Sequence, residues 1–235
     1  KLWSEVLGRS DKAALSMEFW ERDEQSRLDE YLEGVTDEKQ FRARTQRNDG
    51  NFPPGHREMV EAAKSAKRPV IAANAPRPLV RAASKDGYDK LKTLSPDLQR
   101  LYRIPEVVPT GRYREDFEKI MSDPNAAHGP APKTEEEKKA AIEKAFRSQS
   151  LWDWTMADSI AKGLNSGSTP ICHVVGCFHC DFKGGLVQAL DHIRGGTKSI
   201  TVSFVSEWSD TLRDEDKGRG DFVVYVGPAP EDKKN

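Results

Sequence analysis

The stretch PICHVVGCFH, residues 170–179, joins a short apolar run to a glycine turn and a histidine. Pro170 to Val175 is rich in β-branched residues and predicts a buried strand, and Gly184 to Arg194 follows it with helical spacing. Two earlier apolar runs, Ala13 to Phe19 and Pro69 to Ala73, are each followed by helical patterns in the same way. This alternation predicts an α/β fold, with a mostly parallel sheet flanked by helices.

A helical insertion is expected between the second and third of these strands, over about residues 85–165. Its longest element begins at Thr134, which forms a capping box with Glu137, and it extends to about Leu164. Ser122 to Pro132 precedes it and carries three prolines. Because proline interrupts both helices and strands, we expect an exposed loop there.

The remaining pattern fits a single domain over residues 1–227, with a polar tail at 228–235. Two further strands are expected at Ser199 to Val205 and at Asp221 to Val226. Other helical patterns cover Lys1 to Arg9, Trp20 to Gly34, His56 to Lys67 and Pro78 to Ser84.

Charge and hydropathy limit the classes of partner. The 235 residues include 37 Lys and Arg against 38 Asp and Glu, a net charge of -1. A general nucleic-acid binder would carry a basic excess, so this balance argues against one. No apolar run approaches the ~20 residues that a membrane-spanning helix needs. We therefore expect a small molecule or a metal ion as the partner, with no nucleic acid and no transmembrane segment.

Polar residues follow each of the first three predicted strands. Glu18 ends the first strand, Asn74 and Arg77 follow the second, and Gly176 and His179 follow the third. In an open parallel sheet, ligands bind where the carboxyl ends of the strands converge. These side chains are therefore expected around one crevice, although a histidine at a strand end is commonly just hydrogen-bonded.

Three cysteines lie within nine residues and leave several interpretations open. Cys177 and Cys180 have the spacing of half a zinc site or of a redox pair. A closed zinc site needs four ligands, and the chain has no second cysteine pair. Asp181 stands where a c-type haem motif would require histidine. Cys172 is interpreted as a buried structural residue. In an oxidising compartment, Cys177 and Cys180 are the expected disulfide pair.

The end of the long predicted helix carries an unusual charge. Trp152, Asp153, Trp154 and Met156 are close together there. Aromatic and methionine side chains at helical spacing are usually core residues. A carboxylate between two tryptophans is unusual, and paired with Arg77 it would orient the wall of a pocket.

A series of short motifs occurs in fixed order through the chain. The motifs are Met17-Glu18-Phe19, Gln25, Leu28-Asp29-x-Tyr31-Leu32-x-Gly34, Ala73-Asn74-Ala75-Pro76-Arg77, Leu94-Ser95-Pro96, Tyr113-Arg114, Gln149-x-Leu151-Trp152-Asp153-x-x-Met156-Ala157, Gly176-x-x-His179 and Gly184-Gly185. Together, over about residues 14–190, they resemble the ChaN-like haem-binding uptake family of the Tiki superfamily.

The resemblance implies an α/β fold and haem binding tied to iron uptake, often in a lipoprotein of the bacterial envelope or periplasm. More distant relatives imply a divalent metal ion and hydrolysis. The family pattern includes an earlier Gly-x-x-His motif that this chain lacks, and the chain begins at Lys1 without Met. We therefore expect that an amino-terminal strand, and with it any lipid anchor, is missing. A haem held between two copies would require a homodimer, for which no residue argues.

The leading hypothesis is an extracytoplasmic haem or iron-porphyrin binder without turnover. Arg77 would pair with a propionate, and His179 or Tyr113 would be the axial ligand. The candidate ligand-binding residues are Asn74, Arg77, Tyr113, Trp152, Asp153 and Gly176.

A divalent-metal-dependent hydrolase is the alternative hypothesis. Glu18 and His179 would hold the metal ion, with Cys177 and Cys180 as weaker candidates, and Asn74 or Arg77 would stabilise an oxyanion. Glu18 and His179 are also the candidate catalytic residues of this version. A third reading is a non-catalytic domain of a larger envelope protein with a degenerate site.

Overall fold

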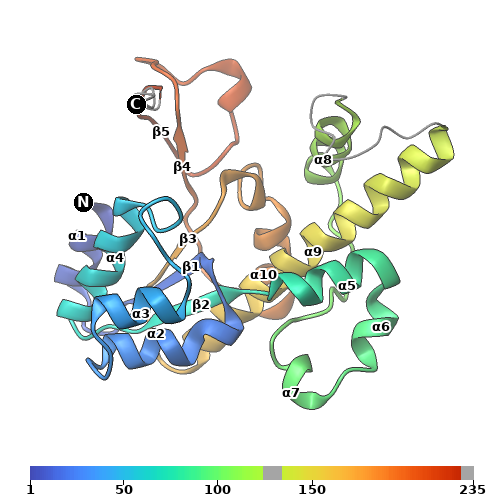
Figure 1. Cartoon of the computed structure of the whole chain (residues 1–235). Coiled ribbons are helices and arrows are strands. Elements are labelled where there is room, and N and C mark those ends of the chain that lie inside the picture. The colour runs from blue at the N-terminus through green and yellow to red at the C-terminus, as the bar shows by residue number, and fades with distance from the viewer. Residues whose placement is uncertain (124–133, 229–235) are drawn as a thin grey trace.

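The computed structural model describes residues 1–123 and 134–228. Most of the loop expected at Ser122 to Pro132 and nearly all of the polar tail lie outside these ranges. The fold is built on a three-stranded parallel sheet with helices on both faces and a helical insertion to one side (Figure 1). The sequence-based expectation of an α/β fold is confirmed.

The central strand β1 (Ala14–Glu21) lies between β2 (Val70–Asn74) and β3 (Ile171–Val174). Leu15 faces Val70 on one side and Cys172 on the other. Residues 14–17 of β1 are all buried, because helices cover both faces of the sheet. The three predicted strands of the central sheet are confirmed to within two residues at each end.

One face of the sheet is covered by the amino-terminal helices. Trp20 and Phe41 pack at 5.3 Å between ring centroids, and Tyr31 stacks on Phe41 at 4.3 Å. The prediction that a helix begins at Trp20 was wrong, because β1 continues to Glu21 and buries the indole. The elements on this side are α1 (Leu2–Arg9), η1 (Arg22–Glu24), α2 (Gln25–Leu32), α3 (Glu38–Arg44) and α4 (Pro54–Ser65).

The long helix α9 (Glu135–Asn165) and α10 (Gly185–Ile193) cover the opposite face. Their core joins Trp154, Met156 and Ile160 of α9 to Leu186 of α10. Thr134 caps α9 by accepting a hydrogen bond from the Glu137 amide at 3.1 Å, as its sequence pattern predicts.

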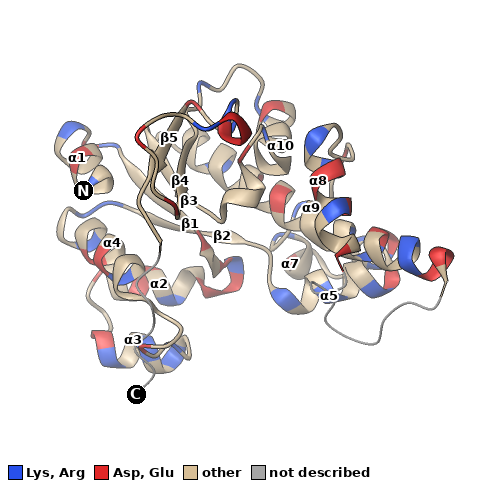
Figure 2. Ribbon diagram, turned by 90° about the horizontal axis from the view of Figure 1, so that it is seen from above, with Lys and Arg blue, Asp and Glu red and all other residues tan. Residues whose placement is uncertain are grey.

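The insertion between β2 and β3 is helical, as expected. Its elements are α5 (Arg77–Asp86), α6 (Tyr88–Lys92), α7 (Pro96–Gln99) and α8 (Arg112–Ser122), followed by α9. Lys and Arg alternate with Asp and Glu along α8 and the exposed half of α9, so neither sign of charge dominates this side (Figure 2).

Beyond α10, β4 (Val202–Val205) and β5 (Phe222–Tyr225) pair in parallel as a separate two-stranded sheet. This sheet projects from the rest of the molecule (Figure 1). The short helices η3 (Cys177–His179) and η4 (Asp214–Asp216) complete the described elements. No helix within residues 1–123 and 134–228 has the length and hydropathy to cross a membrane.

Candidate functional site

A cavity of about 790 Å³ lies at the carboxyl end of the central sheet. We call it the sheet-end cavity. Glu18 and Phe19 reach it from β1, Asn74 from β2, and the turn at Gly176 from the end of β3. The sheet order is β2-β1-β3, so the connections leave β1 on one side and return on its other side. An open α/β sheet leaves a crevice at such a point. Its other lining residues include Arg47, His56, Arg77, Val80, Arg81, Trp152, Val174 and Val175.

Glu18 and Glu21 are the acidic residues of β1 that line this cavity. The Glu18 carboxylate accepts the Gly176 amide hydrogen bond at 2.7 Å, and its Oε1 lies 3.4 Å from His179 Nε2. Burial alone would raise the pKa of Glu18. The bond and charge of His179, together with the Gly176 amide, outweigh burial and lower this pKa to about 2. Glu18 is therefore a fixed carboxylate at neutral pH.

His179 lies behind Glu18 and is 7% exposed. Its Nδ1 is 2.6 Å from Asp153 Oδ1, so the ring is held between two carboxylates. Burial alone would lower the pKa of His179, but Asp153 and then Glu18 raise it to about 10. Both ring nitrogens are engaged, and the side chain does not line the sheet-end cavity.

Asp153 is fully buried on α9 and links His179 to Tyr113. The Tyr113 hydroxyl donates to Asp153 Oδ2 at 2.5 Å, and burial beside this carboxylate raises the pKa of Tyr113. The expected pairing of Asp153 with Arg77 was wrong. Arg77 instead lies 3.4 Å from Glu21, with its side chain 79% exposed. Helix α9 buries Asp153 too deeply to reach the cavity rim.

The other ligand-binding residues predicted from the sequence lie either in the wall of the sheet-end cavity or at its rim. Asn74 is buried, and its Oδ1 accepts the amide hydrogen of Ala75 at 2.9 Å, which fixes the turn after β2. Trp152 supplies an apolar wall. Arg77 and Arg81 lie on the first turns of α5 and are exposed. Arg81 forms no ion pair with any residue that the structure describes.

His56 and Phe19 are cavity residues that the sequence-based reasoning did not identify as functional. The two rings pack edge to face, with centroids 4.8 Å apart. Burial lowers the pKa of His56 against the opposing charge of Glu18, which favours the neutral imidazole. The only local signal was a helix start after Pro53-Pro54-Gly55. The sequence alone does not show which strand end that helix faces.

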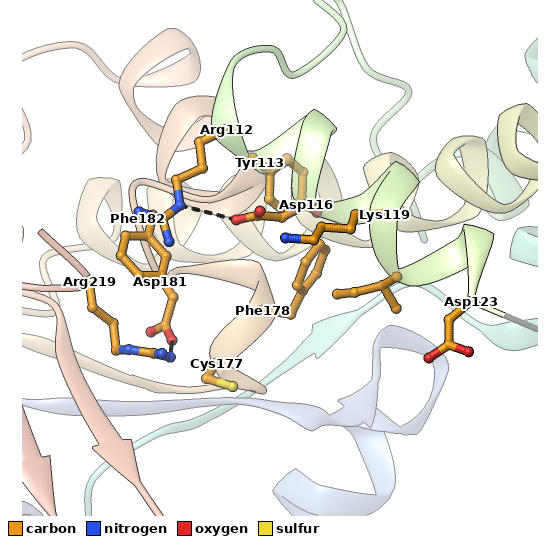
Figure 3. A pocket seen from close by; sticks show the side chains of 11 residues that line it. Arg112, Tyr113, Asp116, Lys119, Asp123, Cys177, Phe178, Asp181, Phe182 and Arg219 are labelled. Carbon is orange, nitrogen blue, oxygen red and sulfur yellow. Dashed lines mark hydrogen bonds and ion pairs between the residues drawn. The ribbon is translucent and has the colours of Figure 1, made fainter. Parts of the chain in front are cut away.

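A second cavity of about 470 Å³ lies between α8 and the turn after β3 (Figure 3). Tyr113 and Cys177 line this cavity and not the first one. The Arg112 guanidinium lies 3.3 Å from the centre of the Phe182 ring. Arg219 reaches in from the carboxyl-terminal segment and bonds Asp181 at 2.7 Å. Tyr113 is thus separated from the sheet-end cavity by Asp153 and His179.

The three cysteines are all free thiols in the structure. Cys180 Sγ donates to the Cys177 carbonyl at 3.6 Å. Burial, and then Asp181, raise the pKa of Cys180 to about 12, and burial also raises the pKa of Cys172. Across the described ranges, no three His, Cys, Asp or Glu side chains are arranged to hold a metal ion. Glu18 and His179 bond each other instead.

Comparison with known proteins identifies the family of this chain and a solved structure that shares its fold. The family model for haem-binding uptake, Tiki superfamily, ChaN matches residues 2–190. A solved structure of cofacial haem binding to ChaN of Campylobacter jejuni aligns with a TM-score of 0.66 at 15% identity, over 94% of this chain and 76% of that chain. At this identity, the similarity shows a shared fold. No curated protein matches the chain.

Proposed function

Since the chain belongs to the ChaN haem-binding uptake family of the Tiki superfamily, we propose that its sheet-end cavity binds haem. The observation that carries this assignment is the composition of the cavity. It combines an aromatic and aliphatic lining with exposed Arg77 and Arg81 at one rim, and the carboxylates of Glu18 and Glu21 also line it. Haem has a flat apolar ring and two carboxylates on one edge. Its ring would face the apolar lining, and its carboxylates would face the arginines.

The residues present fit such a ligand. The cavity volume of about 790 Å³ is within the roughly 300–1,000 Å³ of small-molecule sites. Phe19, Trp152 and Val80 offer apolar surface to a porphyrin ring. Arg77 and Arg81 are exposed cations on neighbouring turns of α5 and would hold the propionates by charge-assisted hydrogen bonds. The haem, when bound, supplies an iron centre and its absorption spectrum.

The buried network stabilises the cavity wall. Glu18 fixes the Gly176 turn through its amide, and His179 fixes Glu18 in turn. Asp153 and Tyr113 complete the chain of hydrogen bonds behind them. In this proposal the network preorganises the site, while the ligand contacts come from Phe19, Trp152 and α5.

Absorption spectroscopy tests the proposal. Ferric haem is added in steps to the purified chain, and the Soret band is compared with that of free haem. We expect a saturable shift at one haem per site. A cavity-filling variant, Ser84→Trp, should reduce the shift, while Ser26→Trp on the exposed face of α2 should not. A spectrum identical to free haem at all protein concentrations would refute haem binding.

We further propose that haem binding serves iron uptake at the bacterial envelope, outside the cytoplasm. Support comes from the description of the family as an uptake family. Cell fractionation with an antibody against the chain tests the location, and growth on haem as the sole iron source tests the role. Detection in the cytoplasmic fraction alone would contradict the location.

The hydrolase alternative is not favoured. It requires several ligands around one metal ion, and the described residues contain no such group of three. Glu18 and His179 were its proposed ligands, and each is already engaged by the other.

A further inference from the structure

We propose that His56 is the side chain that ligates haem iron in the sheet-end cavity. The inference rests on the proposed haem binding and adds the identity of the iron ligand, which neither the family match nor the fold comparison assigns.

The imidazole of His56 is held in place by packing, and its nitrogens form no hydrogen bond with the described residues. It lies in the first turn of α4, and its ring packs on Phe19 with centroids 4.8 Å apart. Nδ1 is enclosed and has no hydrogen-bond partner among the residues that the structure describes. Nε2 makes no hydrogen bond with any residue in the described ranges. A neutral imidazole nitrogen is a common haem ligand, and this one lines the cavity.

The other side chains that could ligate iron are already engaged or lie elsewhere. His179 is bonded through both nitrogens to Asp153 and Glu18. Tyr113 donates its hydroxyl to Asp153 and lines the second cavity. His173 bonds Ser16 through Nδ1, and its Nε2 is enclosed. Among the described residues that line the sheet-end cavity, His56 is the only histidine, and no Tyr, Cys or Met joins it.

The surroundings of His56 suit a porphyrin on its free side. Phe19 braces the ring, and the Arg47 guanidinium lies 4.3 Å from the centre of the Phe19 ring. The Arg47 guanidinium forms an ion pair with the Glu24 carboxylate at 2.9 Å, which fixes the position of Arg47 against Phe19. Helix α4 lies on one side of the sheet end and α5 on the other in both views (Figures 1 and 2). With the iron bound by His56 of α4, the haem propionates would therefore point toward Arg77 and Arg81 of α5.

Resonance Raman spectroscopy of the ferrous haem complex tests the ligand directly, because the iron–histidine stretching band reports a histidine ligand. The samples are the wild-type chain, His56→Gly and His56→Gln, each loaded with haem. His192→Ala is the matched control, since His192 is exposed and bonds Glu106 away from the cavity. Circular dichroism confirms that each variant is folded, and the smaller side-chain change in His56→Gln keeps the test valid if His56→Gly unfolds.

We expect the band in the wild type and in His192→Ala, and its loss in both His56 variants. Added imidazole should restore it in His56→Gly, by filling the space that the side chain leaves. A wild-type complex without the band, or a His56 variant that keeps it, would overturn the assignment of His56 while leaving haem binding intact. A wild type that binds no haem would overturn the proposed function and this assignment together.

Discussion

At the residue scale, the chemistry of the site depends on His179, which is held between the carboxyl groups of Glu18 and Asp153. Burial raises the pKa of Asp153, while the charge and hydrogen bond of His179 oppose that shift. His179 has its pKa raised to about 10, and Glu18 has its pKa lowered to about 2. Removing one partner of such a buried group leaves the other charge uncompensated, which typically costs about 3–5 kcal/mol. The network therefore stabilises the fold as well as the cavity wall.

This network predicts a characteristic pH profile. A raised histidine pKa contributes stability that is complete below the ordinary value of 6.5 and is lost as the pH rises through about 10. The lowered pKa of Glu18 contributes stability above 4.5 that is lost as the pH falls through about 2. We expect the Glu18–His179 pair to contribute most between about pH 4.5 and 6.5.

Urea unfolding at a series of pH values measures this contribution. His179→Gln should lower the free energy of unfolding by about 3–5 kcal/mol near pH 6, and by progressively less toward pH 10. His192→Gln, at an exposed position, is the control and should change little. Parallel curves for the wild type and His179→Gln would show that His179 is not charged in the folded state.

The arginines of α5 give a second prediction. Arg77→Ala combined with Arg81→Ala should raise the Kd for haem at least about tenfold, or about 1.4 kcal/mol, because two charge-assisted contacts to propionates are lost. Arg27→Ala is the matched control, since Arg27 is exposed on α2 and outside the cavity. Equal affinities measured by Soret titration would place the propionates elsewhere.

Single residues were predictable where strand topology determines position. Glu18 lies near the carboxyl end of β1, Asn74 ends β2 and Gly176 follows β3, so their proximity followed from the alternation of strands and helices. The bond between Asp153 and His179 joins a helix to a turn 26 residues away and depends on how deeply α9 packs. No local pattern reports that depth. The roles of all these residues in ligand binding stay predictions.

At the scale of elements, a close approach between α9 and α10 shapes the site. A methyl group on Gly185, the first residue of α10, would overlap the Asp153 carboxylate and lie 2.6 Å from Tyr113 Cε1. Glycine is therefore required where α10 passes the buried network.

Gly185→Ala tests this packing. Because the added methyl group must displace Asp153 or Tyr113, we expect a loss of about 1–3 kcal/mol in the free energy of unfolding, and a weaker haem Soret shift. Gly8→Ala in α1 is the control, because no atom lies within 4 Å of its added methyl group. Thermal melting of both variants gives the comparison, and equal Tm values would contradict the packing argument.

The prediction of helices and strands succeeded where the pattern of apolar residues was clear. Helix α9 and the three central strands have strong patterns. Helix α3 was missed, because it spans seven residues and buries only Phe41. Its start signal was present in the capping box of Asp37 and Gln40. The start of the helix after β1 was misplaced because the charged run at 21–24 belongs partly to the strand end and partly to η1.

At the scale of the whole molecule, a buried carboxylate holds the carboxyl-terminal segment together, and one of its partners, Arg219, links that segment to Asp181. Asp216 bonds Arg213, Arg219 and Tyr225, each at 2.7 Å. Its enclosure comes from these three side chains and not from the hydrophobic core. The bond to Arg213 contributes most to lowering the pKa of Asp216 to about 2. Arg219 also bonds Asp181 beside the second cavity.

Asp216→Ala should therefore loosen β4 and β5 without altering the sheet-end cavity. Hydrogen exchange with mass spectrometry is expected to show faster exchange over residues 199–227, with β1 to β3 unchanged. Asp210→Ala, in the same exposed segment, is the control. Faster exchange throughout the chain would show that the carboxyl-terminal sheet supports the core more generally.

The fold class was predictable because strand-helix alternation is a property of the whole chain. The separation of β4 and β5 into their own sheet was not predictable, since their apolar patterns resemble those of core strands. Phe204 and Phe222 are 56% and 60% exposed in the structure. Only the path of the chain after α10 shows that these strands do not join the central sheet.

Anomalous X-ray diffraction at the iron absorption edge, from crystals of the haem-loaded chain, locates the ligand directly. We predict an iron peak in the sheet-end cavity, beside His56 and Phe19, with the haem propionates toward Arg77 and Arg81. An iron peak in the second cavity, against Tyr113 and Cys177, would contradict this placement.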